Sequence, residues 1–208
     1  MDEHGWLGPI EWAAAGRPLS SGEACGDQPV AVDAGRGAAL FGVLDGLGHG
    51  NEAARAALCG VEVLRRDPAK PLEALIQLCH SKLAGTRGAA VTLARIDFDA
   101  DTLSWTGIGN VTANLVAKAP SGIEVRSSAR LASGIVGYRI PDTVRAQAIS
   151  IRPGDLLVIA SDGIAENHLE RIDFAASATV IAEQILRRYR KETDDALVLA
   201  ARHRGSST

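Results

Sequence analysis

The sequence is poor in cysteine, and the few cysteines it has are badly placed for metal or disulfide chemistry. Cys25, Cys59 and Cys79 lie far apart and form no CxxC pair. They therefore indicate neither a zinc site nor a disulfide framework. Their scarcity favours a reduced setting such as the cytoplasm. We expect Cys59 and Cys79 to be small buried residues rather than reactive thiols.

An excess of basic residues and a long apolar run are missing as well. Lysine and arginine number 22 against 25 acidic residues, which gives a net charge of −3. This balance predicts no surface for routine nucleic-acid binding. No apolar stretch approaches the length that spans a membrane. The start MDEHGWLGPIEW lacks the basic and then apolar pattern of a secretion signal. We therefore expect a cytoplasmic protein that binds neither nucleic acid nor membrane.

Length and composition fit one folded domain. The chain has 208 residues, of which 46% are hydrophobic and 23% are charged, as in ordinary globular proteins. No internal repeat or linker divides it. We predict a single domain over residues 1–201, followed by a disordered tail at 202–208, where the sequence is RHRGSST.

The apolar pattern predicts antiparallel sheets with helices packed outside them. Two predicted helices, at 51–66 and 71–83, fall together, and a third, at 176–191, precedes the last strand. Asn51 is expected to cap the first helix. Between the helices, strands follow one another as hairpins, which favours antiparallel pairing over a parallel βαβ arrangement. The predicted strands lie near residues 10–15, 29–34, 39–44, 89–98, 103–108, 112–117, 144–151, 156–160 and 196–200.

One glycine-rich loop lacks the lysine that a phosphate loop would carry. The stretch FGVLDGLGHGNEAARAA, residues 41–57, places this loop between a predicted strand and a predicted helix. Such loops commonly bind phosphate through backbone N–H groups. This one opens on Asp45, and its spacing is neither GxGxxG nor GxxxxGK. Nucleotide binding is therefore a weak alternative.

Aspartates stand at the ends of several predicted strands. A charged group beside a buried strand is costly unless it is paired or bound to metal. Converging carboxylates would repel one another, and a divalent cation removes that repulsion. Oxygen-only ligands favour magnesium or manganese over zinc. Asp-Gly is also a common turn dipeptide, but two such pairs that each close an apolar strand favour metal. The acids are Asp27 in GEACGDQPV, Asp45 in FGVLDG, Asp162 in LLVIASDG, and Asp194 with Asp195 in ETDDALVLAA.

The ordered set GD, DGLGHG, SDG and DDALVLAA resembles the metal-dependent (type 2C, PPM) serine/threonine protein phosphatases. The resemblance runs from about residue 22 to 201 and is greatest to the bacterial branch of SpoIIE, RsbU and RsbX. The compact length, GIGN at 107–110, and GIVGYRIPD ahead of RPGDLLVIASDGI are most similar to RsbX, which acts on the stressosome. The resemblance implies an α+β fold. This is an αββα four-layer sandwich with two antiparallel β-sheets flanked by helices and a binuclear metal site at one edge.

The resemblance also implies a ligand set for two Mn²⁺ or Mg²⁺ ions. Asp27 would serve one ion, directly or through water. Asp45 would bridge both ions, and the carbonyl of Gly46 would complete one shell. Asp162 and Asp194 would hold the other ion. The family prefers the first acid of the doublet, and we therefore choose Asp194 as the ligand.

The implied reaction is hydrolysis of phosphoserine or phosphothreonine by a metal-activated water. Two ions that share a water lower its pKa and offset charge on the phosphoryl oxygens. No cysteine nucleophile is needed, so Cys25 would be a bystander. The implied partners are phosphorylated stressosome scaffold proteins or proteins of the anti-sigma-antagonist type. The alternative is a catalytically silent relative that binds phosphoproteins and regulates assembly. All the expected ligand positions are occupied, which argues against it.

Two further residues keep two interpretations each, and a third departs from the family pattern. His49 is a candidate general acid for the leaving group, or a loop residue that donates a hydrogen bond. Arg17 is a candidate for contact with the substrate phosphate, or an ordinary solvated arginine. Asn110 stands where many relatives carry an acid in GDSR, and the loss of that charge puts a third metal in doubt.

Overall fold

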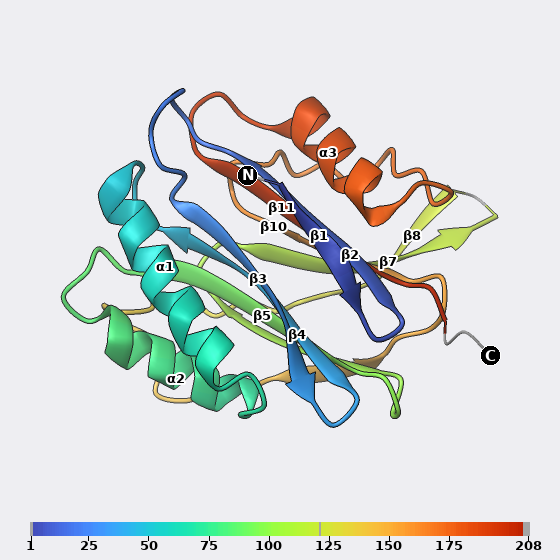
Figure 1. Ribbon diagram of the computed structural model, residues 1–208, viewed down its shortest axis with the longest axis horizontal. Coiled ribbons are helices and arrows are strands. Elements are labelled where there is room, and N and C mark those ends of the chain that lie inside the picture. Colours follow the sequence, from blue (N-terminus) through green and yellow to red (C-terminus); the bar gives the residue numbers. More distant parts are fainter. Residues whose placement is uncertain (1, 121, 206–208) are drawn as a thin grey trace.

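Two antiparallel sheets pack face to face in the computed structural model, which describes residues 2–120 and 122–205 (Figure 1). The five-stranded sheet has the order β3-β4-β5-β6-β9, and the six-stranded sheet has the order β1-β2-β11-β10-β7-β8. The strands of the first are β3 (Asp27–Gly35), β4 (Ala38–Gly46), β5 (Ala89–Asp97), β6 (Thr102–Ile108) and β9 (Gln147–Ser150). Those of the second are β1 (Asp2–Leu7), β2 (Ile10–Arg17), β11 (Ala196–His203), β10 (Leu156–Ala160), β7 (Thr112–Ala119) and β8 (Gly122–Ser128).

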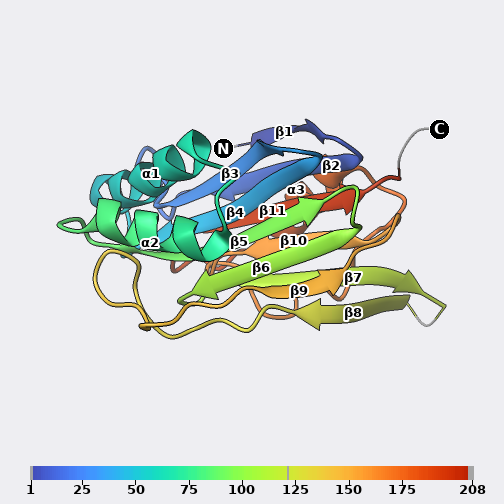
Figure 2. The same cartoon turned by 90° about the horizontal axis from the view of Figure 1, so that it is seen from below.

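Helices cover the outer faces of both sheets. Helices α1 (Asn51–Arg66) and α2 (Leu72–Leu83) lie over the five-stranded sheet, and α3 (Ala178–Tyr189) lies over the six-stranded sheet (Figures 1 and 2). Three apolar cores result, one between the sheets and one under each helical layer. The strand β10 is buried along its whole length, which explains why LLVIA is a continuous apolar run. The predicted αββα four-layer sandwich is therefore confirmed.

Two strands escaped the sequence prediction because both are polar edge strands. β1 has the sequence DEHGWL and β8 has GIEVRSS, so neither shows an apolar run. Each forms through pairing with its neighbour, β2 or β7. The predicted strands and helices are all present; α1 and β10 keep their predicted ends, and the ends of the others shift by up to a few residues. In the part of the chain that is described, no helix has the length and apolarity needed to cross a membrane.

Two local predictions were wrong. Asn51 is the first helical residue of α1 and not its cap, because Gly50, at φ 75°, holds the cap position without a side-chain hydrogen bond. The predicted tail at 202–208 also begins too early. β11 continues to His203, and the Arg204 side chain donates to Glu11 at 2.7 Å. Residues 206–208 of that tail lie outside the described residues.

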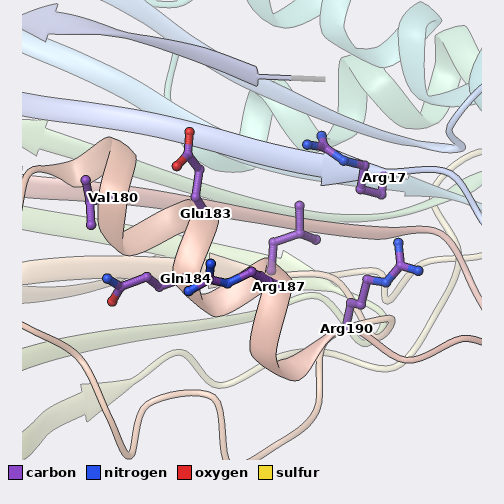
Figure 3. Close-up of a pocket in the computed structure, with 7 residues that line it drawn as sticks. Arg17, Val180, Glu183, Gln184, Arg187 and Arg190 are labelled. Carbon is purple, nitrogen blue, oxygen red and sulfur yellow. The ribbon is translucent and has the colours of Figure 1, made fainter.

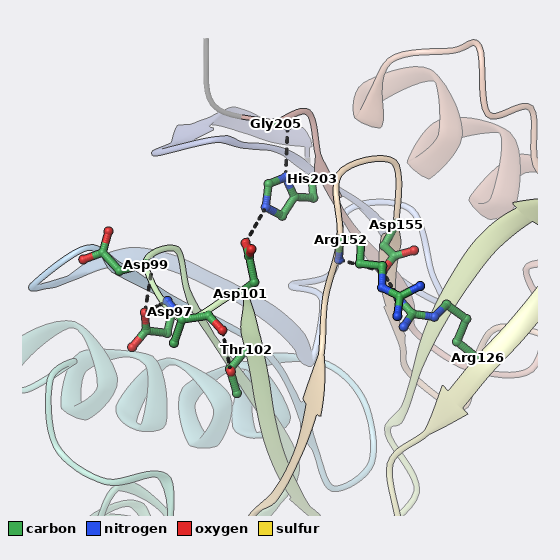
Figure 4. A network of polar contacts seen from close by, with 10 residues as sticks. Asp97, Asp99, Asp101, Thr102, Arg126, Arg152, Asp155, His203 and Gly205 are labelled. Carbon is green, nitrogen blue, oxygen red and sulfur yellow. Dashed lines mark hydrogen bonds and ion pairs between the residues drawn. The ribbon is translucent and has the colours of Figure 1, made fainter. Parts of the chain in front are cut away.

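A polar network joins strands at one end of the sandwich (Figure 4). Asp155 is 5% exposed and accepts hydrogen bonds from the Arg126 guanidinium and, at 2.8 Å, from the backbone N–H of Arg152. Nearby, Nε2 of His203 lies 3.7 Å from Oδ1 of Asp101. The network thus ties β8 and the start of β10 together, and links the end of β11 to the β5–β6 turn.

Replacing Asp155 with alanine is expected to lower the free energy of unfolding by about 2–4 kcal/mol. The reason is that the substitution leaves Arg126, which is only 20% exposed, without its carboxylate. Urea unfolding followed by circular dichroism measures the loss. Asp99→Ala is the matched control, because Asp99 is exposed and its carboxylate accepts no hydrogen bond within the described part of the chain. Equal losses in the two variants would show that the network does not stabilise the sandwich.

Candidate metal centre

Four of the predicted ligands lie where strands of both sheets end. Asp27 opens β3 and is the cross-strand partner of Asp45, near the end of β4. Asp162 lies two residues after the end of β10, and Asp194 lies two residues before the start of β11. Because β10 and β11 are antiparallel neighbours, the end of one lies beside the start of the other. The structure therefore brings these acids to one edge of the sandwich, opposite the polar network.

The carboxylates at this edge destabilise one another's charged forms. Burial, together with the charges of Asp27, Asp162 and Asp194, raises the pKa of Asp45 to about 9. Burial also raises the pKa of Asp27 to about 7, against the lowering effect of a hydrogen bond from Ser161. The pKa of Asp194 is raised as well, chiefly by burial. Such a group of acids gains stability when positive charge is placed among them.

The residues present fit a pair of hard divalent cations. Oδ2 of Asp27 is buried and has no hydrogen-bond partner among the described residues, although buried carboxylate oxygens normally have one. The donors are all oxygen atoms, the kind that Mg²⁺ and Mn²⁺ prefer. Within residues 2–120 and 122–205, no three His, Cys, Asp or Glu side chains stand in the arrangement of a formed metal site. The fit therefore rests on charge, burial and donor chemistry.

The second acid of the doublet has a different environment from the first. Asp195 is 3% exposed, and its two carboxylate oxygens accept hydrogen bonds of 2.7 Å from the backbone N–H groups of Leu19 and Gly26. It therefore anchors the segment that leads into Asp27. Asp194 is partly exposed, and its Oδ1 accepts a hydrogen bond from the N–H of Asp195 at 2.9 Å and from no other group among the described residues. This difference favours Asp194 over Asp195 as a ligand.

Each of the two Asp-Gly pairs uses its glycine for close approach of another backbone. A Cβ on Gly46 would lie 2.1 Å from the carbonyl oxygen of Ala53, in the first turn of α1. A Cβ on Gly163 would lie 1.8 Å from the carbonyl oxygen of Asp195. The family resemblance implies that the carbonyl of Gly46 completes the shell of one ion. The structure adds that the missing side chain of Gly46 lets the first turn of α1 pack against this edge. The predicted use of the Gly46 carbonyl as a ligand stays a prediction.

His49 and Arg17, the candidates for contact with the substrate, also lie near this edge. His49 is 59% exposed, and its Nδ1 lies 3.5 Å from Oε2 of Glu23. It lies close enough to Asp194 that a positive charge on its ring would partly offset the raised pKa of that carboxyl. Arg17 ends β2, and its Nη1 lies 3.1 Å from Oδ1 of Asp2. Arg17 also lines a cavity of about 220 Å³ together with Asp194. Their roles as general acid and phosphate ligand stay predictions.

Sequence reasoning missed the groups that hold Asp162 in place. The Asn110 amide donates to Oδ2 of Asp162 at 2.7 Å, and Nζ of Lys191 donates to the Asp162 carbonyl at 2.6 Å. In the sequence, Asn110 stood out only as a missing acid, and no local pattern marks Lys191.

Cys25 is 8% exposed, and burial, aided by the charge of Asp27, raises its pKa to about 12. Such a thiol is a poor nucleophile at neutral pH, which agrees with its expected role as a bystander.

Comparison with known proteins places the chain among phosphatase domains. The family model described as Stage II sporulation protein E (SpoIIE) matches residues 35–204. No curated protein sequence matches the chain.

Solved structures with the same fold cover nearly all of the chain. One, described as "The bacterial stressosome: a modular system that has been adapted to control secondary messenger signaling", is 32% identical with a TM-score of 0.82. The similarity covers 93% of this chain and 99% of that one. RsbX in complex with magnesium is 19% identical with a TM-score of 0.78, covering 97% and 98% of the two chains. The catalytic domain of the serine/threonine phosphatase PstP in complex with two manganese ions is 19% identical with a TM-score of 0.64, covering 93% and 97%.

Proposed function

Because the chain belongs to the SpoIIE family of type 2C protein phosphatases, we propose that its acidic edge is the centre of a stress-signalling phosphatase. Family membership makes the protein a metal-dependent serine/threonine phosphoprotein phosphatase. The proposal assigns the positions: Asp27, Asp45, the carbonyl of Gly46, Asp162 and Asp194 hold two Mn²⁺ or Mg²⁺ ions. The observation that carries it is the group of aspartates at one edge that raise one another's pKa.

The chain's own residues hold the centre in a fixed geometry. When bound, the ions supply positive charge that lowers the pKa of a water and offsets charge on the phosphoryl oxygens. The pairing of β3 with β4 sets the spacing of Asp27 and Asp45. Asn110 orients the Asp162 carboxylate through its hydrogen bond. Rigid donors of this kind lower the cost of reorganisation during the reaction.

Two exposed side chains act on the substrate in this proposal. His49, beside Glu23, holds a proton for the serine or threonine oxygen that leaves. Arg17, which lines a cavity with Asp194, binds the phosphate of the incoming residue. Both side chains are exposed enough to meet a protein substrate.

The proposed substrates are phosphorylated stressosome scaffold proteins or proteins of the anti-sigma-antagonist type. Support comes from the 32% identity to a protein whose structure is described as part of work on the bacterial stressosome. The chain also shares its fold with RsbX over almost its whole length.

Phosphate release from a phosphoserine protein of this class, with Mn²⁺ present, tests the proposed function. We expect turnover that a chelator stops, and a fall of at least about 100-fold in Asp27→Asn. Asp33→Asn is the matched control, because Asp33 is an exposed aspartate on the same strand, β3. Equal rates in the two variants would overturn the assignment of Asp27. Tight Mn²⁺ binding without turnover on any phosphoprotein would favour the silent alternative.

A further inference from the structure

A cavity of about 460 Å³ runs along α3, from Val180 in its first turn to Arg190 just after its end, beside Arg17 at the end of β2 (Figure 3). Arginines supply most of the charge on its walls. Arg17 comes from β2, Arg187 from the last turn of α3, and Arg190 from the residue that follows the helix. Glu183 is the one acid among the described residues that line it. The cavity therefore carries a net positive charge.

This cavity continues toward the proposed metal centre. The neighbouring cavity of about 220 Å³ shares Arg17 and Arg190 with the first. The charged residues it adds to the lining are Lys191, Glu192 and Asp194. Lys191 also donates to the carbonyl of Asp162 at 2.6 Å. A substrate segment whose phosphoserine sits at the acidic edge can therefore place a neighbouring residue among the arginines.

Internal ion pairs leave the arginines of the cavity available to bind an anion. Among the described residues, neither Arg187 nor Arg190 forms an ion pair. Arg17 pairs with Asp2, but both side chains are about half exposed, and such pairs contribute little. Favourable interaction with the helix dipole accounts for basic residues in the last turn of α3. The same interaction extends to Arg190, which is the C-cap of α3, but it does not account for Arg17, which lies on β2.

We propose that this cavity binds an anionic side chain of the protein substrate, next to the phosphoserine held at the metal centre. The inference rests on the proposed function and adds a substrate class: phosphosites flanked by a carboxylate or by a second phosphate. Guanidinium groups bind both anions through paired N–H donors. The chemistry that the two anions share is a compact group of oxygen atoms with negative charge.

Three phosphoserine peptides of one sequence test the inference, with flanking glutamate, a flanking second phosphoserine, or flanking glutamine. We expect kcat/KM for the anionic peptides to exceed that for the glutamine peptide by about 10-fold. The double variant Arg187→Gln, Arg190→Gln should bring this ratio close to one. The first two peptides show which anion the cavity prefers.

Arg188→Gln is the matched control. Arg188 lies in the same last turn of α3 and carries the same charge, but it does not line the cavity. It should keep the preference for anionic peptides. The inference is overturned when wild type shows no preference, when the preference survives the double substitution, or when Arg188→Gln removes it equally.

Binding separates the inference from the proposed function. Fluorescence anisotropy of a labelled glutamate peptide should show binding that weakens several-fold in the double variant and not in Arg188→Gln. Charge-dependent binding without turnover of any phosphopeptide means that the proposed function fails while the anion site stands. Turnover without charge preference, and with equal binding by all variants, means that the proposed function stands and the anion site does not exist.

Discussion

Replacing Asp45 with asparagine is expected to reduce phosphatase activity by at least about 1000-fold while making the metal-free protein more stable. Burial and the charges of Asp27, Asp162 and Asp194 raise the pKa of Asp45 from 3.8 to about 9. The charge that the reaction needs is therefore one that opposes folding. Asparagine keeps the shape of the side chain and removes its charge.

The gain in stability has a defined dependence on pH. The folded protein holds the Asp45 proton more tightly than the unfolded chain does. The stability of the metal-free wild type therefore falls as pH rises from about 4 toward about 9. Asp45→Asn lacks this contribution. The difference in free energy of unfolding between variant and wild type should grow over that window and reach about 1–3 kcal/mol.

Urea unfolding with a chelator present, at about pH 5 and about pH 8, measures this difference. Added Mn²⁺ should then raise the melting temperature of wild type and of Asp33→Asn, but not that of Asp45→Asn. If Asp45→Asn has a lower free energy of unfolding than wild type in the presence of the chelator, the argument that repulsion between these carboxylates destabilises the metal-free protein is wrong. Equal stabilisation of all three proteins by Mn²⁺ contradicts the assignment of Asp45 as a ligand.

Gly163→Ala is expected to lower the free energy of unfolding by about 3 kcal/mol or more and to abolish activity. The added Cβ would lie 1.8 Å from the carbonyl oxygen of Asp195 and 2.8 Å from its carbonyl carbon. Both atoms belong to the backbone and cannot rotate away. A shift of Asp195 would release its hydrogen bonds to Leu19 and Gly26 and displace Asp194.

Gly154→Ala separates this steric effect from the ordinary cost of replacing glycine. Gly154 has φ 96°, and no atom lies within 4 Å of a Cβ built on it. Its replacement should cost about 1 kcal/mol through backbone strain alone. Urea unfolding of both variants makes the comparison. Similar losses at the two positions would mean that Asp195 does not approach Gly163 as closely as the structure shows.

Much of the fold was predictable because the information is local. A continuous apolar run marks β10, and apolar spacing marks α1 and α3, whatever lies around them. β1 and β8 were missed because pairing with a neighbouring strand, rather than their own composition, makes them strands. The cap of α1 was missed because the left-handed conformation of Gly50 depends on how the loop meets the helix.

The candidate site was also predictable only in part. The order and position of the aspartates in the sequence predicted Asp27, Asp45, Asp162 and Asp194 as ligands of one metal centre. No pattern in the sequence indicated that Asp195 binds two backbone N–H groups. Nor did any pattern place arginines from β2 and α3 around one cavity. These contacts join segments that are distant along the chain.

By itself, the sequence determined the three helices, every strand except β1 and β8, which acids stand at strand ends, and which family the chain resembles. Only the tertiary structure decided which strand ends meet and how deeply each carboxylate is buried. The physical reason is that the cost of a charge depends on its burial and on the charges near it. Both are set by the packing of one sheet on the other, which no local stretch of sequence encodes.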